Sequence, residues 1–204
     1  MSAPGHDFYG QGPRRVQELL GTRRLADHIA QRYVADRLDD TAAGIIEAAD
    51  CFYLATANAA GAPDCSYKGG LPGFLKILAP DQLMFPSYDG NGMFRSLGNI
   101  LENPRVGILI IDYEKPIKLR INGEAQVSQN PEQLQVFPEA DAVVLIRTTE
   151  VFENCPRYLH EMGQRRHSDY VPRPGHVPPD PEWKLKSEYE GLVRLRNQRP
   201  DQVP

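Results

Sequence analysis

Residues 105–127 read RVGILIIDYEKPIKLRINGEAQV and contain the clearest strand patterns in the chain. Arg105 to Ile111 form an almost continuous apolar run of strand length. A turn containing Pro116 follows. From Ile117 to Val127 apolar and polar residues then alternate, which is typical of a strand with one buried and one polar face. The stretch therefore predicts two consecutive strands.

The sequence before and after this stretch continues the pattern. Runs of strand length, separated by Gly, Pro or Asp, are CFYLATA (51–57), DCSYK (64–68), GFLKIL (73–78) and QLMFPS (82–87). A helical pattern begins at Arg95, and residues 142–152 predict one more strand. Short strands at this spacing, with one inserted helix, predict a mainly β fold with flanking helices, built on a mostly antiparallel barrel.

The flanking regions differ in character from this core. Helical spacing begins near Pro13 with a break at Gly21, and a further helix starts at Asp40-Thr41. After Asn154, CPRYLHEMG predicts a helix, and residues 171–186 are too rich in proline for a regular helix or a central strand. We expect a single domain, with a helical extension packed on the barrel (1–50), a core (51–155), and a helix with a Pro-rich arm (156–204).

Composition excludes several classes of function. The 204 residues are 41% apolar with a net charge of −4, which argues against a nucleic-acid surface. We expect no membrane partner, because no apolar stretch approaches the roughly 20 residues of a membrane span and the first residues lack a signal-peptide core. Three widely spaced cysteines predict a cytoplasmic protein with reduced thiols, Cys155 among them as a buried, inert one. The five histidines show no metal-ligand spacing, so no metal is expected. Phosphate-loop, GxGxxG, GxSxG and HExxH motifs are missing.

One helix start raises a question about ligands. In FPSYDGNGMFRSLGNILENP (85–104), the first helical turn contains Arg95 and Ser96. A helix N-terminus has partial positive charge and unpaired N–H groups, so a cation there is slightly unfavourable. Either Arg95 points into water, or an anion is bound by the N–H groups, the Ser96 hydroxyl and the guanidinium together.

Other polar residues are predicted near this helix start, on the barrel strands. The candidate cofactor-binding residues are Ser66, Lys68, Lys76, Ser87, Asn91, Arg95, Ser96, Asn99, Lys118 and Arg120. A helix N-terminus, hydroxyls and several cations would suit a phosphate attached to an aromatic group. The alternative is that each is an ordinary solvated side chain, and sequence spacing does not decide between the two.

The order and spacing of several motifs resemble the pyridoxamine 5′-phosphate oxidase-like flavoproteins, which have the FMN-binding split β-barrel fold. The motifs are FYLATA (52–57), SYKGGLPGF (66–74), DGNGMFRSLGNI (89–100), NP (103–104) and LRINGEA (119–125). The resemblance covers residues 52–127, and ENCPRYL (153–159) is similar to a later signature of the family's uncharacterised flavin-nucleotide-binding branch. It implies FMN as cofactor and a homodimer that binds FMN at the subunit interface.

The resemblance also implies roles for individual residues. Lys76 falls at the lysine of the family's first FMN-contacting strand. Arg95 and Ser96 fall at its phosphate-binding Arg-Lys pair, so a hydroxyl replaces the second cation, and Lys68 or Lys76 would supply that charge. Lys118 falls at a flavin-edge glutamine, where a cation would stabilise negative charge on reduced flavin. On this resemblance, Arg95 faces a phosphate.

The C-terminus departs from the vitamin B6 enzyme of the family. Its substrate-binding R-L-H-x-R-like segment is missing, and only Trp183 corresponds to the tail tryptophan. We therefore do not expect vitamin B6 oxidation. We expect an FMN-dependent oxidoreductase that passes electrons from NAD(P)H or a related donor to a small organic molecule or oxygen; no catalytic acid or base is identified. The alternatives are a flavin-nucleotide-binding protein for storage or sensing, and a barrel that uses haem or deazaflavin.

Overall fold

The structure, a computed structural model, describes residues 8–113, 115, 117–155, 159, 169–187, 190 and 195. The chain divides into two compact units, residues 1–165 and residues 166–204. The first unit contains the predicted barrel, and the second contains the Pro-rich segment.

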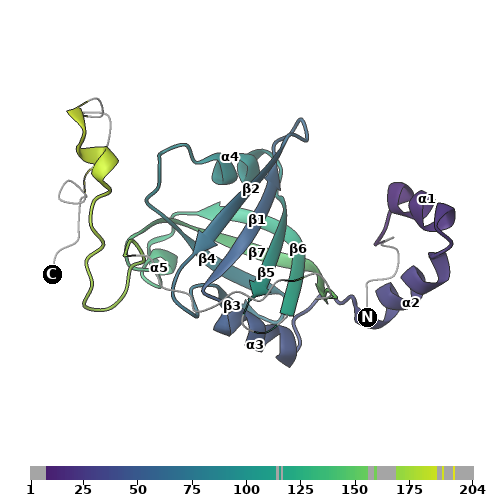
Figure 1. The fold of residues 1–204 in the computed structure, drawn as a ribbon. Coiled ribbons are helices and arrows are strands. Elements are labelled where there is room, and N and C mark those ends of the chain that lie inside the picture. Colours follow the sequence, from purple (N-terminus) through teal and green to yellow (C-terminus); the bar gives the residue numbers. More distant parts are fainter. Residues whose placement is uncertain are drawn as a thin grey trace. The chain divides into compact units, whose positions relative to one another are not determined.

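A single seven-stranded sheet forms the centre of the first unit, in the order β2-β1-β5-β6-β7-β4-β3 (Figure 1). Its strands are β1 (Cys51–Ala57), β2 (Pro63–Gly69), β3 (Lys76–Ala79), β4 (Gln82–Tyr88), β5 (Arg105–Asp112), β6 (Ile117–Ser128) and β7 (Ala140–Glu153). Every neighbouring pair is antiparallel. The protein is thus mainly β with flanking helices and has the split-barrel fold, which confirms the predicted fold class.

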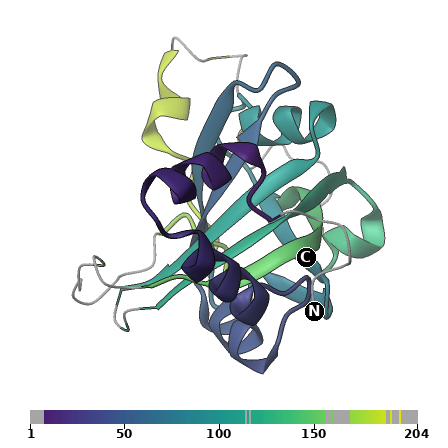
Figure 2. The same ribbon diagram turned by 90° about the vertical axis from the view of Figure 1, so that its right-hand side faces the viewer.

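The alternation in β6 determines which face of the sheet is buried. Leu119 and Ile121 are each 1% exposed, whereas Lys118 and Arg120 lie on the opposite face. Ile121 pairs with Ile108 of β5, so the apolar faces of the two strands coincide. The core is completed by Phe52 of β1, whose ring contacts other core aromatic rings, and by side chains of β4 and β7. Figure 2 shows the strong twist of the strands around this core.

Three helices lie close to the sheet. Helix α3 (Asp40–Ala48) begins at the predicted Asp40 and buries Ala42 and Ile46; its N-cap is Asp39, which accepts a hydrogen bond from the Ala42 N–H. Helix α4 (Arg95–Glu102) begins at the predicted Arg95. Helix α5 (Pro131–Leu134), capped by Asn130, was not predicted. Figure 1 shows α4 beside β2, and α3 beside β3.

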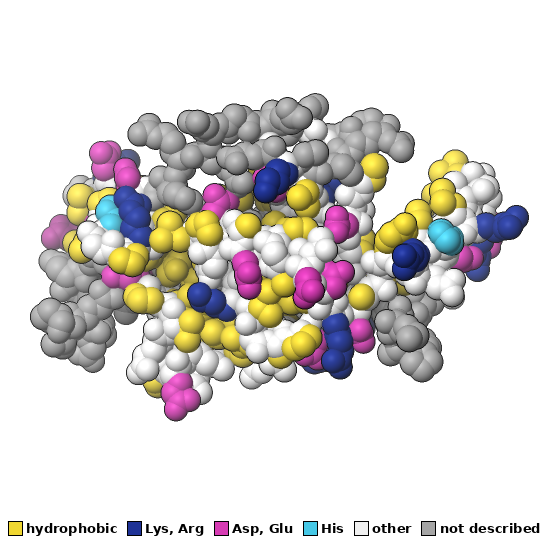
Figure 3. All heavy atoms as spheres, turned by 90° about the horizontal axis from the view of Figure 1, so that it is seen from below, with side chains coloured by type: hydrophobic (Ala, Val, Ile, Leu, Met, Phe, Trp, Pro, Cys, Tyr) yellow, Lys and Arg dark blue, Asp and Glu magenta, His cyan; other side chains and the backbone are white. Residues whose placement is uncertain are grey.

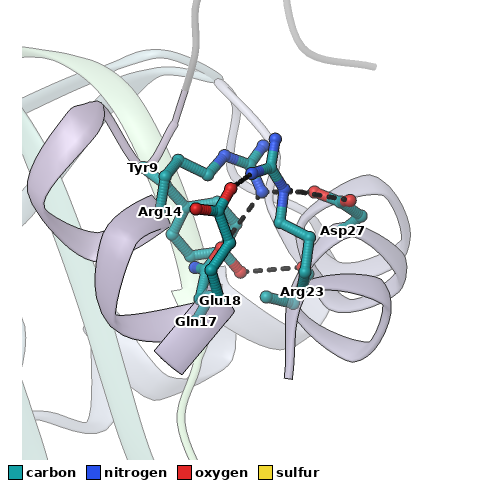
Figure 4. A network of polar contacts seen from close by, with 7 residues as sticks. Tyr9, Arg14, Gln17, Glu18, Arg23 and Asp27 are labelled. Carbon is teal, nitrogen blue, oxygen red and sulfur yellow. Dashed lines mark hydrogen bonds and ion pairs between the residues drawn. The ribbon is translucent and has the colours of Figure 1, made fainter. Parts of the chain in front are cut away.

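Helices α1 (Gln11–Leu19) and α2 (Arg23–Tyr33) form a hairpin whose turn contains Gly21 with φ of 67°, at the predicted break. Polar contacts join the two helices (Figure 4): Arg14 with Asp27, and Arg23 with Glu18 at 2.7 Å. Their large apolar side chains are mostly exposed: Val16, Leu19, Leu20, Leu25, Ile29 and Tyr33. The hairpin is attached to the sheet by a bridge between Ala35 and Val151.

Figure 3 shows the underside of Figure 1, where acidic side chains are interspersed among apolar ones. No described helix is long and apolar enough to cross a membrane. In the second unit, the described part of the Pro-rich segment forms only an isolated Arg173–His176 bridge and a 3₁₀ turn, η1 (Glu182–Leu185). The helix predicted from Pro156 and the side chain of Trp183 lie outside the described part.

Candidate cofactor-binding site

Strand β2 directs alternate side chains to opposite faces of the sheet. Its pairing with β1 places Ser66 opposite Leu54 and Lys68 opposite Phe52, both of which belong to the core. Asp64 pairs with Thr56 and therefore belongs to the same inward row. Cys65 and Tyr67 face the other way and are exposed. The inward row is thus polar although its β1 neighbours are mostly apolar.

Helix α4 begins without a side-chain cap. Its N-cap residue, Phe94, has left-handed backbone angles (φ 47°, ψ 30°), and its first turn contains no acidic residue. The Asn91 side chain, three residues before the N-cap, accepts a hydrogen bond from the Met93 N–H at 3.0 Å. The first N–H groups of α4 therefore keep their capacity to bind an acceptor from outside the helix.

Two contacts hold the start of α4 on β2. The hydroxyl oxygens of Ser66 and Ser96 are 3.0 Å apart, and Ser96 is 5% exposed. Arg95 Nε lies 3.3 Å from Asp64 Oδ1. Between these elements and the end of β4 is a cavity of about 410 Å³, which we call the α4 pocket. Its polar lining residues include Asp64, Ser66, Lys68, Ser87, Asn91, Arg95 and Ser96.

Burial perturbs two titratable groups in the α4 pocket. It lowers the pKa of the Lys68 ammonium, and the nearby Asp64 carboxylate opposes this shift only in part. It also raises the pKa of the Tyr88 hydroxyl, and the negative charge of Glu139 adds to that effect. Burial makes the charged form of the Lys68 ammonium less stable than it would be in water. An anion bound beside Lys68 would therefore stabilise the ammonium, and the ammonium would strengthen binding of the anion.

A second cavity, of about 400 Å³, lies on the opposite face of the same sheet, and we call it the outer pocket. Its lining residues include Tyr53, Gly107, Lys118, Arg120 and Asn122. The Arg120 guanidinium lies over the ring of Phe152, 5.2 Å from its centroid, which is a cation–π geometry. Cys65 lines both pockets, so they adjoin at β2, which is the edge strand of the sheet.

The ten predicted residues therefore fall into three groups. Six line the α4 pocket: Ser66, Lys68, Ser87, Asn91, Arg95 and Ser96. Lys118 and Arg120 line the outer pocket. The remaining two line neither: Lys76 is exposed on β3, and Asn99 donates a hydrogen bond to Thr56 Oγ1 at 3.0 Å, linking α4 to β1. The structure thus separates side chains that the sequence grouped around one helix start.

Sequence reasoning missed Asp64 and Tyr88 in the α4 pocket, and Tyr53 and Asn122 in the outer pocket. The alternation of β2 was a usable signal for Asp64, since Ser66 and Lys68 share its row. One prediction about the cysteines was wrong: Cys155, which was expected to be buried, is exposed just beyond the end of β7. Within the described ranges, no cluster of three or more His, Cys, Asp or Glu side chains could hold a metal ion.

Comparison with known proteins adds the family. Residues 38–154, which include every residue of both pockets, match the pyridoxamine 5′-phosphate oxidase family. The chain belongs to this family. A comparison with curated proteins gave no match.

Solved structures are similar at low identity. A putative pyridoxamine 5′-phosphate oxidase from Lactobacillus delbrueckii is 22% identical, with 58% of this chain and 95% of that chain covered and a TM-score of 0.46. An F420 reductase is 18% identical over 56% of this chain and 98% of its own (TM-score 0.42). HutZ, a haem storage protein from Vibrio cholerae, is 20% identical, with 55% of this chain and 89% of that chain covered and a TM-score of 0.38.

Proposed function

We propose that this protein binds FMN, with the phosphate in the α4 pocket, and acts as an FMN-dependent oxidoreductase. The observation that carries the proposal is the start of α4. An uncapped helix N-terminus, with an arginine in place of the usual acidic residue, opens into a pocket beside two serine hydroxyls and a partly desolvated lysine. Each of these features favours an anion.

The side chains present fit a phosphate. Arg95 offers guanidinium N–H donors, Lys68 offers an ammonium, and the hydroxyls of Ser66 and Ser96 offer hydrogen-bond donors 3.0 Å apart. Arg95 and Ser96 fall at the family's Arg-Lys pair, and Lys68 rather than the exposed Lys76 is placed to supply the second positive charge. When bound, flavin supplies hydride or single-electron transfer, while the protein binds and orients it.

The arrangement of the two pockets supports a homodimer. Arg95 and Lys118 line pockets on opposite faces of one sheet, so a flavin reaches both only around the edge of β2 or by lying between two copies of the chain. The outward face also presents apolar surface that a second copy would cover, including Tyr67, which is 62% exposed. We propose that FMN binds at this subunit interface, with Lys118 near the ring.

The chemistry we propose is transfer of electrons from NAD(P)H or a related donor to a small organic substrate or oxygen. Vitamin B6 is not the proposed substrate, because the C-terminal sequence lacks the substrate-binding segment of that enzyme. No described side chain in either pocket is assigned as a general acid or base. If bound FMN is not reduced by any such donor, the protein instead stores or senses flavin nucleotide.

The features of the α4 pocket that favour a phosphate support flavin over haem, although Cys65, Met93 and Tyr88, which also line it, are residue types that can ligate haem iron. Haem iron is usually held by histidine, cysteine, methionine or tyrosine side chains, histidine being the most common. Neither pocket is lined by a described histidine, and the two histidines that the structure describes, His28 and His176, lie outside both. A deazaflavin also has a phosphate group, so the α4 pocket by itself does not distinguish it from FMN.

The test is to identify the cofactor and then to measure what binds it. The absorbance spectrum of the purified protein and of the released cofactor distinguishes oxidised flavin, deazaflavin and haem. Titration of the apoprotein should then show tighter binding of FMN than of riboflavin, which has the same ring without the phosphate. A haem or deazaflavin spectrum, or equal affinities for FMN and riboflavin, would refute the proposal.

A further inference from the structure

Asp64 is the only acidic residue, among those the structure describes, that lines the α4 pocket. We infer that Asp64 is a built-in counter-ion, which competes with a bound phosphate for Arg95 and so sets which phosphate charge the pocket prefers. The inference rests on the proposed function for its natural ligand, but it concerns the pocket's response to any phosphate.

The geometry places the carboxylate where an anion would bind. Asp64 Oδ1 is 3.3 Å from Arg95 Nε, across the gap between β2 and the first turn of α4. The side chain of Asp64 is 19% exposed and that of Arg95 is 59% exposed, so the carboxylate is part of the pocket wall while the guanidinium remains accessible. A phosphate that binds this guanidinium must share it with Asp64 or displace it.

The charges in the α4 pocket determine how the contact between Asp64 and Arg95 affects a bound phosphate. The charged groups that line the α4 pocket together with Asp64 are Arg95 from α4 and Lys68 from its own strand, and the other titratable groups that line it include Tyr88 from β4. Two cations and one carboxylate leave the pocket with a single net positive charge while Lys68 is protonated. A phosphate monoester carries one negative charge below its second pKa of about 6 and two above it. Asp64 therefore opposes the dianion about twice as strongly as the monoanion, by Coulomb's law.

Removing the charge of Asp64 without changing its size should strengthen phosphate binding. Asp64→Asn should tighten FMN binding at pH 7.5 by roughly three- to thirtyfold, allowing for solvent screening of a partly exposed pair. The gain should be smaller at pH 5.5, where the phosphate is mainly a monoanion. Tyr88 stays neutral in this range because its pKa is raised, so it does not contribute to the difference. Riboflavin binding should not change at either pH.

The experiment compares the full-length wild-type apoprotein with three variants. FMN and riboflavin are titrated at both pH values into wild type, Asp64→Asn, Asp64→Glu and Glu124→Gln. Glu124 is a matched control, because it is an exposed carboxylate paired with Arg147 at 2.6 Å and lines neither the α4 pocket nor the outer pocket. Asp64→Glu keeps the charge and should bind FMN like wild type. Inorganic phosphate, followed by thermal stabilisation of the apoprotein, serves as a probe without the flavin ring.

The outcomes separate this inference from the proposed function. Weaker FMN binding by Asp64→Asn would show that the carboxylate orients Arg95 for the ligand, and it would overturn the inference. An equal gain in Glu124→Gln, or a gain of the same size at both pH values, would overturn it as well. If wild type binds FMN and riboflavin equally while phosphate stabilises Asp64→Asn more than wild type, the counter-ion role stands and the FMN proposal fails.

Discussion

The α4 pocket and the outer pocket have similar volumes, and each is lined by two cationic residues, but they hold these cations differently. In the α4 pocket, Arg95 lies in the first turn of a helix, where the dipole disfavours it, and Lys68 is partly desolvated. In the outer pocket, Arg120 lies against the ring of Phe152 on an open sheet face. In the α4 pocket Asp64 offsets part of this cost and a bound anion would offset more, whereas Arg120 has a favourable contact with an aromatic ring.

This difference shows that a cationic side chain indicates a ligand site only when its own position in the fold is unfavourable. A cation in an unfavourable position implies a ligand or a counter-ion, and the α4 pocket provides room for both. A cation with an aromatic or solvent contact is explained without a ligand. The following predictions test whether the two pockets differ in this way.

The largest effect is expected for Arg95→Ala. It should remove one or two charge-assisted hydrogen bonds to phosphate, each contributing about 1.5–3 kcal/mol, and so weaken FMN binding by roughly ten- to a few-hundredfold. Riboflavin affinity and apoprotein melting temperature should hardly change, because the arginine opposes the helix dipole and its ion pair is largely exposed. Fluorescence titration of both ligands measures this.

Arg147→Ala is the control for Arg95→Ala, since Arg147 is equally exposed, also pairs with a carboxylate and lines neither of the two pockets. It should leave both affinities unchanged. Equal losses of FMN and riboflavin binding in Arg95→Ala, or a large fall in its apoprotein stability, would make Arg95 a structural residue.

The second effect is expected for Lys68→Met, which should weaken FMN binding by roughly three- to thirtyfold. The apoprotein should become more stable at neutral pH, because an apolar side chain of similar length avoids the desolvation of the ammonium. A loss of apoprotein stability together with unchanged FMN affinity would show that Lys68 supports the fold instead.

The pH dependence of Lys68 provides an independent measurement. Its folded-state pKa is lowered below the usual 10.5, so the unfolded chain binds this proton more tightly. Below the folded pKa, the penalty for burying the ammonium is fully present; between that pKa and 10.5 it disappears and stability rises with pH. Denaturant unfolding across this window should show a rise in wild type that is reduced in Lys68→Met. Parallel profiles would mean that Lys68 is not desolvated.

A smaller effect, on the reduction potential of the flavin and not on its affinity, is expected for Lys118→Met in the outer pocket. If Lys118 lies near the flavin ring, loss of its charge should destabilise reduced flavin and lower the midpoint potential by on the order of 30 mV, with little change in FMN affinity. Spectroelectrochemical titration measures the potential, with Arg147→Met as control. An unchanged potential accompanied by lost binding would make Lys118 a phosphate ligand.

The smallest effect on FMN is expected for Arg120→Met, because its guanidinium already contacts Phe152. FMN affinity should change by less than about twofold, while the apoprotein should lose about 0.5–1 kcal/mol of stability with the cation–π contact. Chemical denaturation and FMN titration give the two values. A loss of FMN affinity as large as that of Arg95→Ala would remove the distinction between the two pockets.

Local patterns predicted much of the fold. The apolar run of β5 and the alternation of β6 identified two strands, and the alternation also identified the buried face of β6, because side chains in a strand alternate between faces whatever surrounds them. The start of α4 at Arg95 followed from its helical pattern, and the break at Gly21 from the turn preference of glycine. Helix α5 was missed, since four residues are too few to show a helical period.

The candidate site was predicted less completely, because it depends on contacts between distant residues. The two serines that join β2 to α4 are thirty residues apart in the sequence, and Asp64 and Arg95, which form an ion pair, are also distant in the sequence. Lys76, which the family motif assigned to the cofactor, is exposed on β3 and lines neither pocket. Spacing along the chain does not show which side chains converge.

The sequence by itself determined the family, the strands of the core and the unusual helix start, since each depends on residues that are close together in the chain. Only the tertiary structure decided that Ser66, Lys68 and Arg95 share a pocket, that Lys118 and Arg120 lie on the opposite face of the sheet, and that Asp64 contacts Arg95. The physical reason is strand register: pairing and helix docking bring distant segments together, and a shift of one residue in β2 would send its polar row to the other face.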